Sequence, residues 1–123
     1  MAKKAIEVKR FSAGVIAEFI QRVLIAAEMP RGDAQVVATL MTEADVNGSD
    51  GHGVFRLPGY IRRIKEGGLN LNPEIHIERE KSGMALVDGD NAQGHLVMRY
   101  CAELAIKKAK SSGVAWVGAH DSN

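Results

Sequence analysis

The chain has 123 residues, of which 46% are hydrophobic and 25% are charged. This is the composition of a globular protein, with room for one domain or for parts of two. The formal net charge is +1, and the basic residues occur as scattered pairs rather than as a patch: Lys3-Lys4, Arg62-Arg63 and Lys107-Lys108. We therefore expect no nucleic-acid partner and no recruitment to a charged membrane surface.

Membrane insertion and export leave no trace in the sequence. No apolar run approaches the roughly 18 residues of a membrane span, and the N-terminal segment MAKKAIEVKRF lacks the apolar block of a signal peptide. The single cysteine, Cys101, lies among apolar residues at helical spacing, which predicts a buried thiol that is typical of a reducing compartment. We expect a cytoplasmic protein.

The first part of the chain predicts helices. Ser12 is a candidate N-cap, and an apolar stripe with a 3.6-residue period follows it: Val15, Ile16, Phe19, Ile20, Val23 and Leu24. Met29-Pro30 ends this helix, because proline disfavours helical backbone in the residue before it. A second helix, capped by Asp33, carries a second stripe: Val36, Val37, Leu40, Met41 and Ala44. Two such helices predict an antiparallel pair.

A loop over 47–54, with Gly48 in a left-handed conformation, should separate these helices from a short third helix at about 55–66. After Pro73 the pattern changes to strands, first around Ile75 and Ile77 and then over 84–88. A helix over 94–112, ended by Gly113, and a buried strand over 114–118 complete the pattern of an α/β unit. The polar segment 87–95 matches neither a dinucleotide fingerprint nor a P-loop, and we expect it to form a turn.

The predicted fold class is therefore mixed, α+β or α/β, with a boundary near residue 74. Residues 1–74 should form a helical N-terminal domain, and residues 75–123 the beginning of an α/β domain. So few strands with one helix leave sheet edges and faces uncovered. We therefore expect the sequence to be a fragment of a longer protein.

The segment ADVNGSDGHGVFRLPGY, from Ala44 to Tyr60, carries the candidate chemistry. His52, Arg56 and Tyr60 are spaced four residues apart and would project from one side of a helix that begins near His52. Arginine binds a carboxylate through a planar fork, histidine transfers a proton near neutral pH, and tyrosine adds a hydrogen bond and an apolar wall. Such a group suits a small 2-oxo or 2-hydroxy acid.

Spacing alone leaves other interpretations open. Three polar residues at this interval are often a solvated helix face, His52 can simply bind a backbone carbonyl group, and Tyr60 can be a half-buried packing residue.

The exact sequence of the segment from Ala44 to Tyr60 is more specific than the spacing of its polar residues. It resembles the N-terminal signature of the malate/L-lactate dehydrogenase family, a group distinct from the Rossmann-type lactate and malate dehydrogenases. The matching residues are Ala44-Asp45, Asp50, Gly51, His52-Gly53-Val54, Arg56-Leu57-Pro58 and Tyr60. The similarity continues through GGLNLNPEI, ALVDGDNAQGH and AELAIKKAKSSGV to AHDSN, so it covers nearly the whole chain.

This resemblance implies an oxidoreductase that uses NAD or NADP and transfers a hydride between the nicotinamide and a small 2-hydroxy or 2-oxo acid. It implies that His52 is a catalytic acid/base or polarises the substrate, that Arg56 binds the substrate carboxylate, and that Tyr60 lines the pocket. It also implies a homodimer. It assigns no cofactor-binding residue, since most of that region would follow Asn123.

Two positions depart from the family pattern or lie at its limit. Many relatives have serine before the histidine, where this chain has Gly51, which leaves the substrate open. Family members also carry a Ser-Asn-His motif whose histidine is a catalytic acid/base, and here Ser122-Asn123 is present as the last pair. His120 has the wrong offset for that role, so we expect it to be a loop histidine that follows a strand.

The remaining histidine of interest, His95, should cap a turn or contact solvent. No carboxylate–histidine cluster has the spacing of a zinc site along the chain, so we expect no metal. The leading hypothesis is the N-terminal part of a dehydrogenase that is inactive by itself. The alternative is a catalytically dead helical module for interaction or dimerisation.

Overall fold

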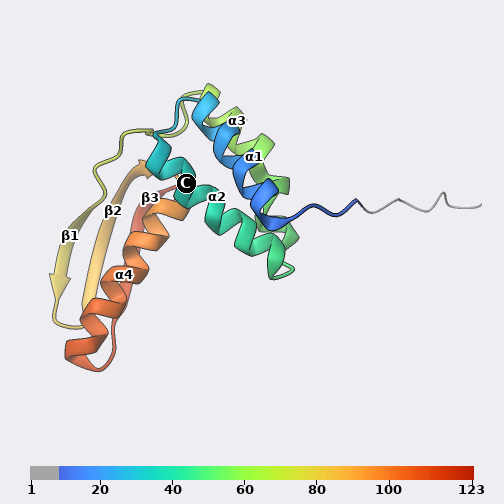
Figure 1. Cartoon of the computed structure of the whole chain (residues 1–123). Helices are drawn as coiled ribbons and strands as arrows, with labels where there is room; N and C mark the ends of the chain where they lie inside the picture. Colours follow the sequence, from blue (N-terminus) through green and yellow to red (C-terminus); the bar gives the residue numbers. More distant parts are fainter. Residues whose placement is uncertain (1–8) are drawn as a thin grey trace, which may run out of the picture.

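The computed structural model describes residues 9–123, so Lys3-Lys4 and most of the segment considered for a signal peptide lie outside it. Two helices come first, α1 (Ala13–Ala26) and α2 (Arg31–Val46), and they run in opposite directions against each other, as predicted (Figure 1). Ser12 caps α1, since its Oγ accepts a hydrogen bond from the Val15 backbone N–H at 3.4 Å. The predicted antiparallel pair and this N-cap are confirmed.

The N-cap predicted at Asp33 is wrong. Helix α2 begins at Arg31, directly after Pro30, whose extended backbone (φ −53°, ψ 140°) takes the cap position. Proline has a φ suited to a helix entrance and no N–H to satisfy, so the helix starts earlier than the acidic residue. Asp33 lies in the first turn instead, where its charge favours the positive end of the helix dipole.

The helical core consists of buried side chains from α1, from α2, from the connection between them and from the start of the third helix: Ile20, Leu24, Met29, Ala34, Val37, Ala38, Met41 and Leu57. Two members of the predicted α1 stripe do not join it, since Val15 and Phe19 are 54% and 52% exposed. The stripe is wider than the surface that α2 can cover.

Two short 3-10 turns, η1 (Asp50–His52) and η2 (Val54–Arg56), lie between α2 and α3 (Leu57–Lys65). Gly48 has the predicted left-handed backbone, with φ 78°. The third helix is shorter than the predicted 55–66, and Pro58 occupies its first turn, where a missing N–H costs nothing.

The second half forms β1 (His76–Lys81), β2 (Met84–Ala92), α4 (Gly94–Ser112) and β3 (Trp116–Ser122). The strand order is β1-β2-β3, with β1 antiparallel and β3 parallel to β2. Helix α4 connects the two parallel strands, so the predicted α/β unit and the mixed fold class are confirmed. The boundary near residue 74 stays a prediction, although helices precede that point and strands follow it.

The predicted bounds of the two parallel strands, β2 and β3, are wrong. Strand β2 continues through Ala92, where a polar turn was expected, and β3 begins two residues later and ends four residues later than predicted, so that it includes His120. The reason is that Val87, Gly89 and Ala92 still face the core, while the polar residues between them face away. Asp90 and Asn91, with φ of 49° and 56°, form an irregularity in the pairing.

Helix α4 covers one face of the sheet (Figure 1), and Val87, Ala92, Val97 and Cys101 form the core between them. Cys101 is buried, as predicted, and burial raises the pKa of its thiol. At the far end, Lys108 ties α4 to β1 through its Nζ, which lies 2.7 Å from Glu80 Oε2. No helix within residues 9–123 has the length and apolarity needed to cross a membrane.

Gly89 allows β2, β3 and α4 to approach closely. A Cβ atom there would lie 2.6 Å from the Asp121 carbonyl oxygen and 2.9 Å from Val97 Cγ2. We expect Gly89→Ala to lower the free energy of unfolding by about 1–3 kcal/mol, as overpacking does, measured by urea denaturation. Gly14→Ala is the control, because an added Cβ on α1 meets open space; equal losses in both variants would contradict the assignment.

Candidate active site

A depression of about 650 Å³ lies where the helices meet the beginning of α4. Its walls come from α2, η1, α3 and α4 and from the residue after β3; the lining residues are Leu40, Ala44, His52, Tyr60, Gly94, His95, Met98, Arg99, Ala102, Glu103, Ile106 and Asn123. Most of this surface is apolar, and a few polar groups converge at the end near α3. Such a surface suits a small organic molecule with a polar head.

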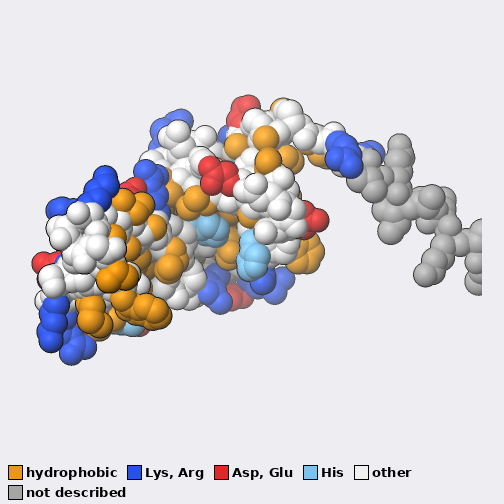
Figure 2. Space-filling view, turned by 90° about the horizontal axis from the view of Figure 1, so that it is seen from below, with side chains coloured by type: hydrophobic (Ala, Val, Ile, Leu, Met, Phe, Trp, Pro, Cys, Tyr) orange, Lys and Arg blue, Asp and Glu red, His pale blue; other side chains and the backbone are white. Residues whose placement is uncertain are grey.

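Three predicted or candidate residues meet at that polar end. His52 is exposed on η1, Tyr60 is half-buried on α3, and His95 comes from the first turn of α4. The rings of Tyr60 and His95 meet edge to face, with centroids 5.6 Å apart and planes at 85°. Histidine side chains lie near the middle of the face shown in Figure 2, between the helical part and the sheet part.

Arg56 lies beside this group but does not line the depression. No helix begins near His52, because Gly53 separates two 3-10 turns and changes the direction of the side chains, so the three predicted residues do not share one helix face. The Arg56 side chain is exposed, and its Nε–H donates to the Gly51 carbonyl oxygen at 2.9 Å. This bond uses only Nε–H, so the two terminal nitrogens of the guanidinium group remain available to bind a ligand side by side.

A half-buried contact between a carboxylate and the backbone fixes the segment that carries His52. Asp45, at the end of α2, accepts a hydrogen bond from the Val54 N–H at 2.8 Å. The contact requires glycine at position 53, since a Cβ there would overlap the Asp45 carboxylate at 1.7 Å from Oδ1. The Ala-Asp and His-Gly-Val parts of the signature therefore have a structural role in addition to any chemical one.

Gly51 lies under no such constraint. A Cβ at this position meets nothing within 4 Å, and the backbone φ is not in the left-handed region. A serine hydroxyl would therefore fit here beside His52 without displacing any neighbour.

His95 was not predicted as a site residue. It is half-buried, and its Nδ1 lies 3.2 Å from Gln93 Nε2. Desolvation by burial, and secondly the charge of His52, lower the pKa of His95. The available sequence signal was its place at the beginning of a helix directly after a strand, which is where α/β proteins collect ligand-binding groups.

His120 lies outside the depression, on β3 rather than in the predicted loop. Its two ring nitrogens contact carboxylates, Nδ1 with Asp121 Oδ2 at 2.9 Å and Nε2 with Glu78 Oε2 at 2.6 Å. The hydrogen bond with Asp121, followed by that with Glu78, raises the pKa of His120. Its contribution to folding stability is therefore present at low pH and is lost as the pH rises through the folded-state pKa.

Asn123 joins the depression to the rest of the fold. Its backbone N–H donates to the Ala92 carbonyl oxygen at 3.1 Å, and its carbonyl oxygen accepts from the Gly94 N–H. Its side-chain Oδ1 accepts from Arg63 Nη1 at 2.8 Å. The end of β3 is thereby held against both α3 and the beginning of α4.

Comparison with known proteins agrees with the signature. The family model described as malate/L-lactate dehydrogenase matches residues 11–123. The chain belongs to the malate/L-lactate dehydrogenase family. Among family relatives, it is 45% identical over 105 residues to malate dehydrogenase of Pyrococcus horikoshii, covering 85% of this chain and 29% of that protein.

A second relative and a solved structure extend the comparison. The L-sulfolactate dehydrogenase of Methanothermobacter thermautotrophicus is 38% identical over 106 residues, covering 86% of this chain and 31% of that protein. The solved structure of malate dehydrogenase from Pyrococcus horikoshii OT3 superposes with a TM-score of 0.91 and 39% identity, covering all of this chain and 35% of that one. The chain thus spans about a third of the length of the family members that it matches.

The burial of His95 gives a prediction about pH. Its folded-state pKa lies below the ordinary value of 6.5, so the unfolded chain binds the proton more readily. This site should therefore lower the free energy of unfolding as the pH falls below 6.5. Histidine NMR titration should show a depressed His95 pKa, which His52→Ala raises. If the His95 pKa were unchanged in His52→Ala, the two imidazoles would not interact.

Proposed function

We propose that this chain is the N-terminal part of an NAD- or NADP-dependent 2-hydroxyacid dehydrogenase or 2-oxoacid reductase. The observation that supports it best is the convergence of His52 and Tyr60 on one depression, with Arg56 beside them, in a chain of the malate/L-lactate dehydrogenase family. Relatives that bear the names malate, L-sulfolactate and ureidoglycolate dehydrogenase indicate the substrate class, a small acid with an oxygen at C2. We further propose a cytoplasmic homodimer.

In this proposal Arg56 binds the substrate carboxylate. Its Nε–H bond to the Gly51 carbonyl oxygen anchors the guanidinium group to the residue before His52. The remaining end-on pair of nitrogens can form two parallel charge-assisted hydrogen bonds with a carboxylate. A carboxylate bound there would lie next to the segment that carries His52, so that the C2 oxygen of the same small acid faces His52.

His52 polarises the C2 oxygen or exchanges a proton with it. The imidazole is exposed at the rim, so a substrate can reach it without rearrangement of the core. Tyr60 provides an apolar wall, and its ring contact fixes the position of the His95 ring. A half-buried His95 of lowered pKa stays neutral near pH 7 and can accept or donate a hydrogen bond.

The nicotinamide cofactor would supply or accept the hydride at C2. The N–H of Gly94 at the beginning of α4 is not free for its phosphates, because it is bound to the Asn123 carbonyl oxygen. Gly89 faces packed backbone rather than open space. We therefore assign no cofactor-binding residue within this chain, and no choice between NAD and NADP.

The family pattern places a catalytic histidine directly after Asn123. Since Asn123 lies on the rim of the depression, a residue attached to it would start close to His95. We infer that the acid/base group of the complete protein is delivered by this strand end, with His52 on the opposite wall.

Arg56→Ala in the full-length protein tests the substrate assignment. Loss of a bidentate contact to the carboxylate should weaken substrate binding by roughly 2–5 kcal/mol, measured as kcat/KM with malate, lactate and sulfolactate and with both cofactors. Arg62→Ala is a matched control, because Arg62 is an exposed arginine on α3 that does not line the depression. Unchanged kinetics for Arg56→Ala would refute the assigned role.

The purified 123-residue chain should neither oxidise NADH with a 2-oxoacid nor bind NADH or NADPH tightly, since we assign no cofactor-binding residue within it. Absorbance at the reduced nicotinamide band and fluorescence titration would measure both. Measurable turnover by the chain alone would show that its residues form a complete site.

An interaction module without catalysis is the second candidate. Several large apolar side chains are exposed, including Phe19 on α1 and Trp116 on β3, at 52% and 74%, and such surfaces often contact a partner. Sequencing of the gene beyond the Asn123 codon distinguishes the candidates. A histidine codon and a long continuing reading frame support the enzyme, whereas an immediate stop codon supports the module.

A further inference from the structure

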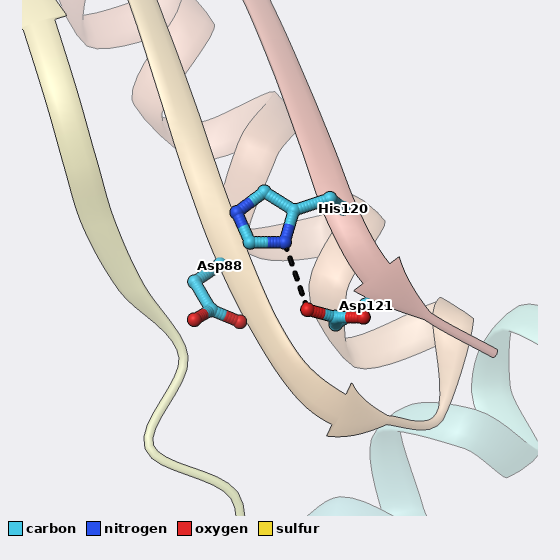
Figure 3. Close-up of side chains that lie close together, drawn as sticks. All are labelled: Asp88, His120 and Asp121. Atoms are coloured by element: carbon cyan, nitrogen blue, oxygen red, sulfur yellow. Dashed lines mark hydrogen bonds and ion pairs between the residues drawn. The ribbon is translucent and has the colours of Figure 1, made fainter.

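A second group of polar side chains lies on the sheet face that α4 leaves uncovered, away from the depression. Asp88 on β2 and His120 on β3 are partners in the parallel pairing, so their side chains lie side by side on one face. Their neighbours Val87 and Ala119 pack toward α4 instead. Asp121 follows His120, and its φ of 48° breaks the strand alternation, which brings its carboxylate to the same side (Figure 3).

The donor atoms of these three residues converge. One ligand atom each of Asp88, His120 and Asp121 lies within 4.8 Å of the other two. Donor atoms around a tetrahedral zinc ion are about 3.4 Å apart, given bonds of about 2.1 Å. Asp88 and His120 are half-buried and Asp121 is exposed, so the group is open to solvent on one side.

Glu78, on strand β1, contacts the other ring nitrogen of His120. His120 Nε2 lies 2.6 Å from Glu78 Oε2, while Nδ1 faces Asp121 at 2.9 Å. Metal-binding histidines usually donate the N–H of the second ring nitrogen to a carboxylate, which fixes the tautomer and the ring orientation. With Nε2–H held by Glu78, Nδ1 faces the space between Asp88 and Asp121, and a metal ion bound there would replace the Nδ1 proton that now bonds to Asp121.

We propose that Asp88, His120 and Asp121 bind a divalent first-row transition-metal ion such as Zn²⁺, with Glu78 as the positioning residue. One imidazole nitrogen and two carboxylates form a mixed donor set that suits such ions better than Mg²⁺ or Ca²⁺, which prefer oxygen ligands only. Water can take the remaining coordination position, because the group is open to solvent. The site is separate from the proposed dehydrogenase chemistry, and the two proposals stand or fall independently.

The test is isothermal titration of the metal-free 123-residue chain with ZnCl₂, together with thermal unfolding in the presence and absence of Zn²⁺. We expect one ion per chain and a Zn²⁺-dependent rise in Tm, because a ligand that binds only the folded state stabilises it. MgCl₂ at the same concentration should produce neither effect. Absence of saturable Zn²⁺ binding would overturn the proposal.

Variants locate the ion. Asp121→Asn keeps a residue type that tolerates the left-handed backbone but removes the charge, and His120→Gln removes the nitrogen ligand. Each should weaken Zn²⁺ binding at least about tenfold, with circular dichroism showing that the fold is retained. His52→Gln removes an exposed histidine from the depression and should leave Zn²⁺ affinity unchanged; a loss there, with binding retained in His120→Gln, would place the ion in the depression and refute the proposed site.

Discussion

The parallel pairing of β2 with β3 places the end of one strand beside the helix that follows the other. Asn123 therefore lies against Ala92 and Gly94 through two backbone hydrogen bonds, and its side chain holds Arg63 of α3. This contact draws Tyr60 and the beginning of α4 toward a common space, where His95 meets the Tyr60 ring. Without the strand pairing, the helical half and the sheet half would share much less surface.

Close backbone approach makes this pairing possible. Gly89 and Gly94 face the carbonyl oxygens of Asp121 and Asn123 at distances that no Cβ would allow. In the helical half, Gly53 has the same function toward the Asp45 carboxylate. These three glycines thus serve packing between elements, in addition to any approach by a ligand.

The helical half was largely predictable because its apolar residues follow a single period. Ile20, Leu24, Val37 and Met41 all lie on the predicted stripes and are fully buried. The strand ends were less predictable, because Asp90 and Asn91 read as a turn although β2 continues through them. Only pairing with β3, across a long stretch of sequence, makes that segment a strand.

The candidate site also has a part that the local sequence predicted and a part that only the fold brings together. His52 and Tyr60 were found from the local string, and both line the depression. His95 was missed because its neighbour Tyr60 is far away in sequence, and the His120 group was missed because Asp88 and His120 meet only through strand pairing. The arrangement of Arg56 could not be predicted, since it depends on a turn that the Asp45 contact imposes.

The open space around Gly51 has an evolutionary consequence. A glycine codon of the GGU or GGC type becomes a serine codon through one base change, and neither residue disturbs the surrounding packing. This position beside His52 can therefore exchange a hydrogen atom for a hydroxymethyl group at almost no cost to folding. A substitution at Gly51 can therefore change the group beside His52 without altering the contact between Asp45 and Val54 that fixes this segment.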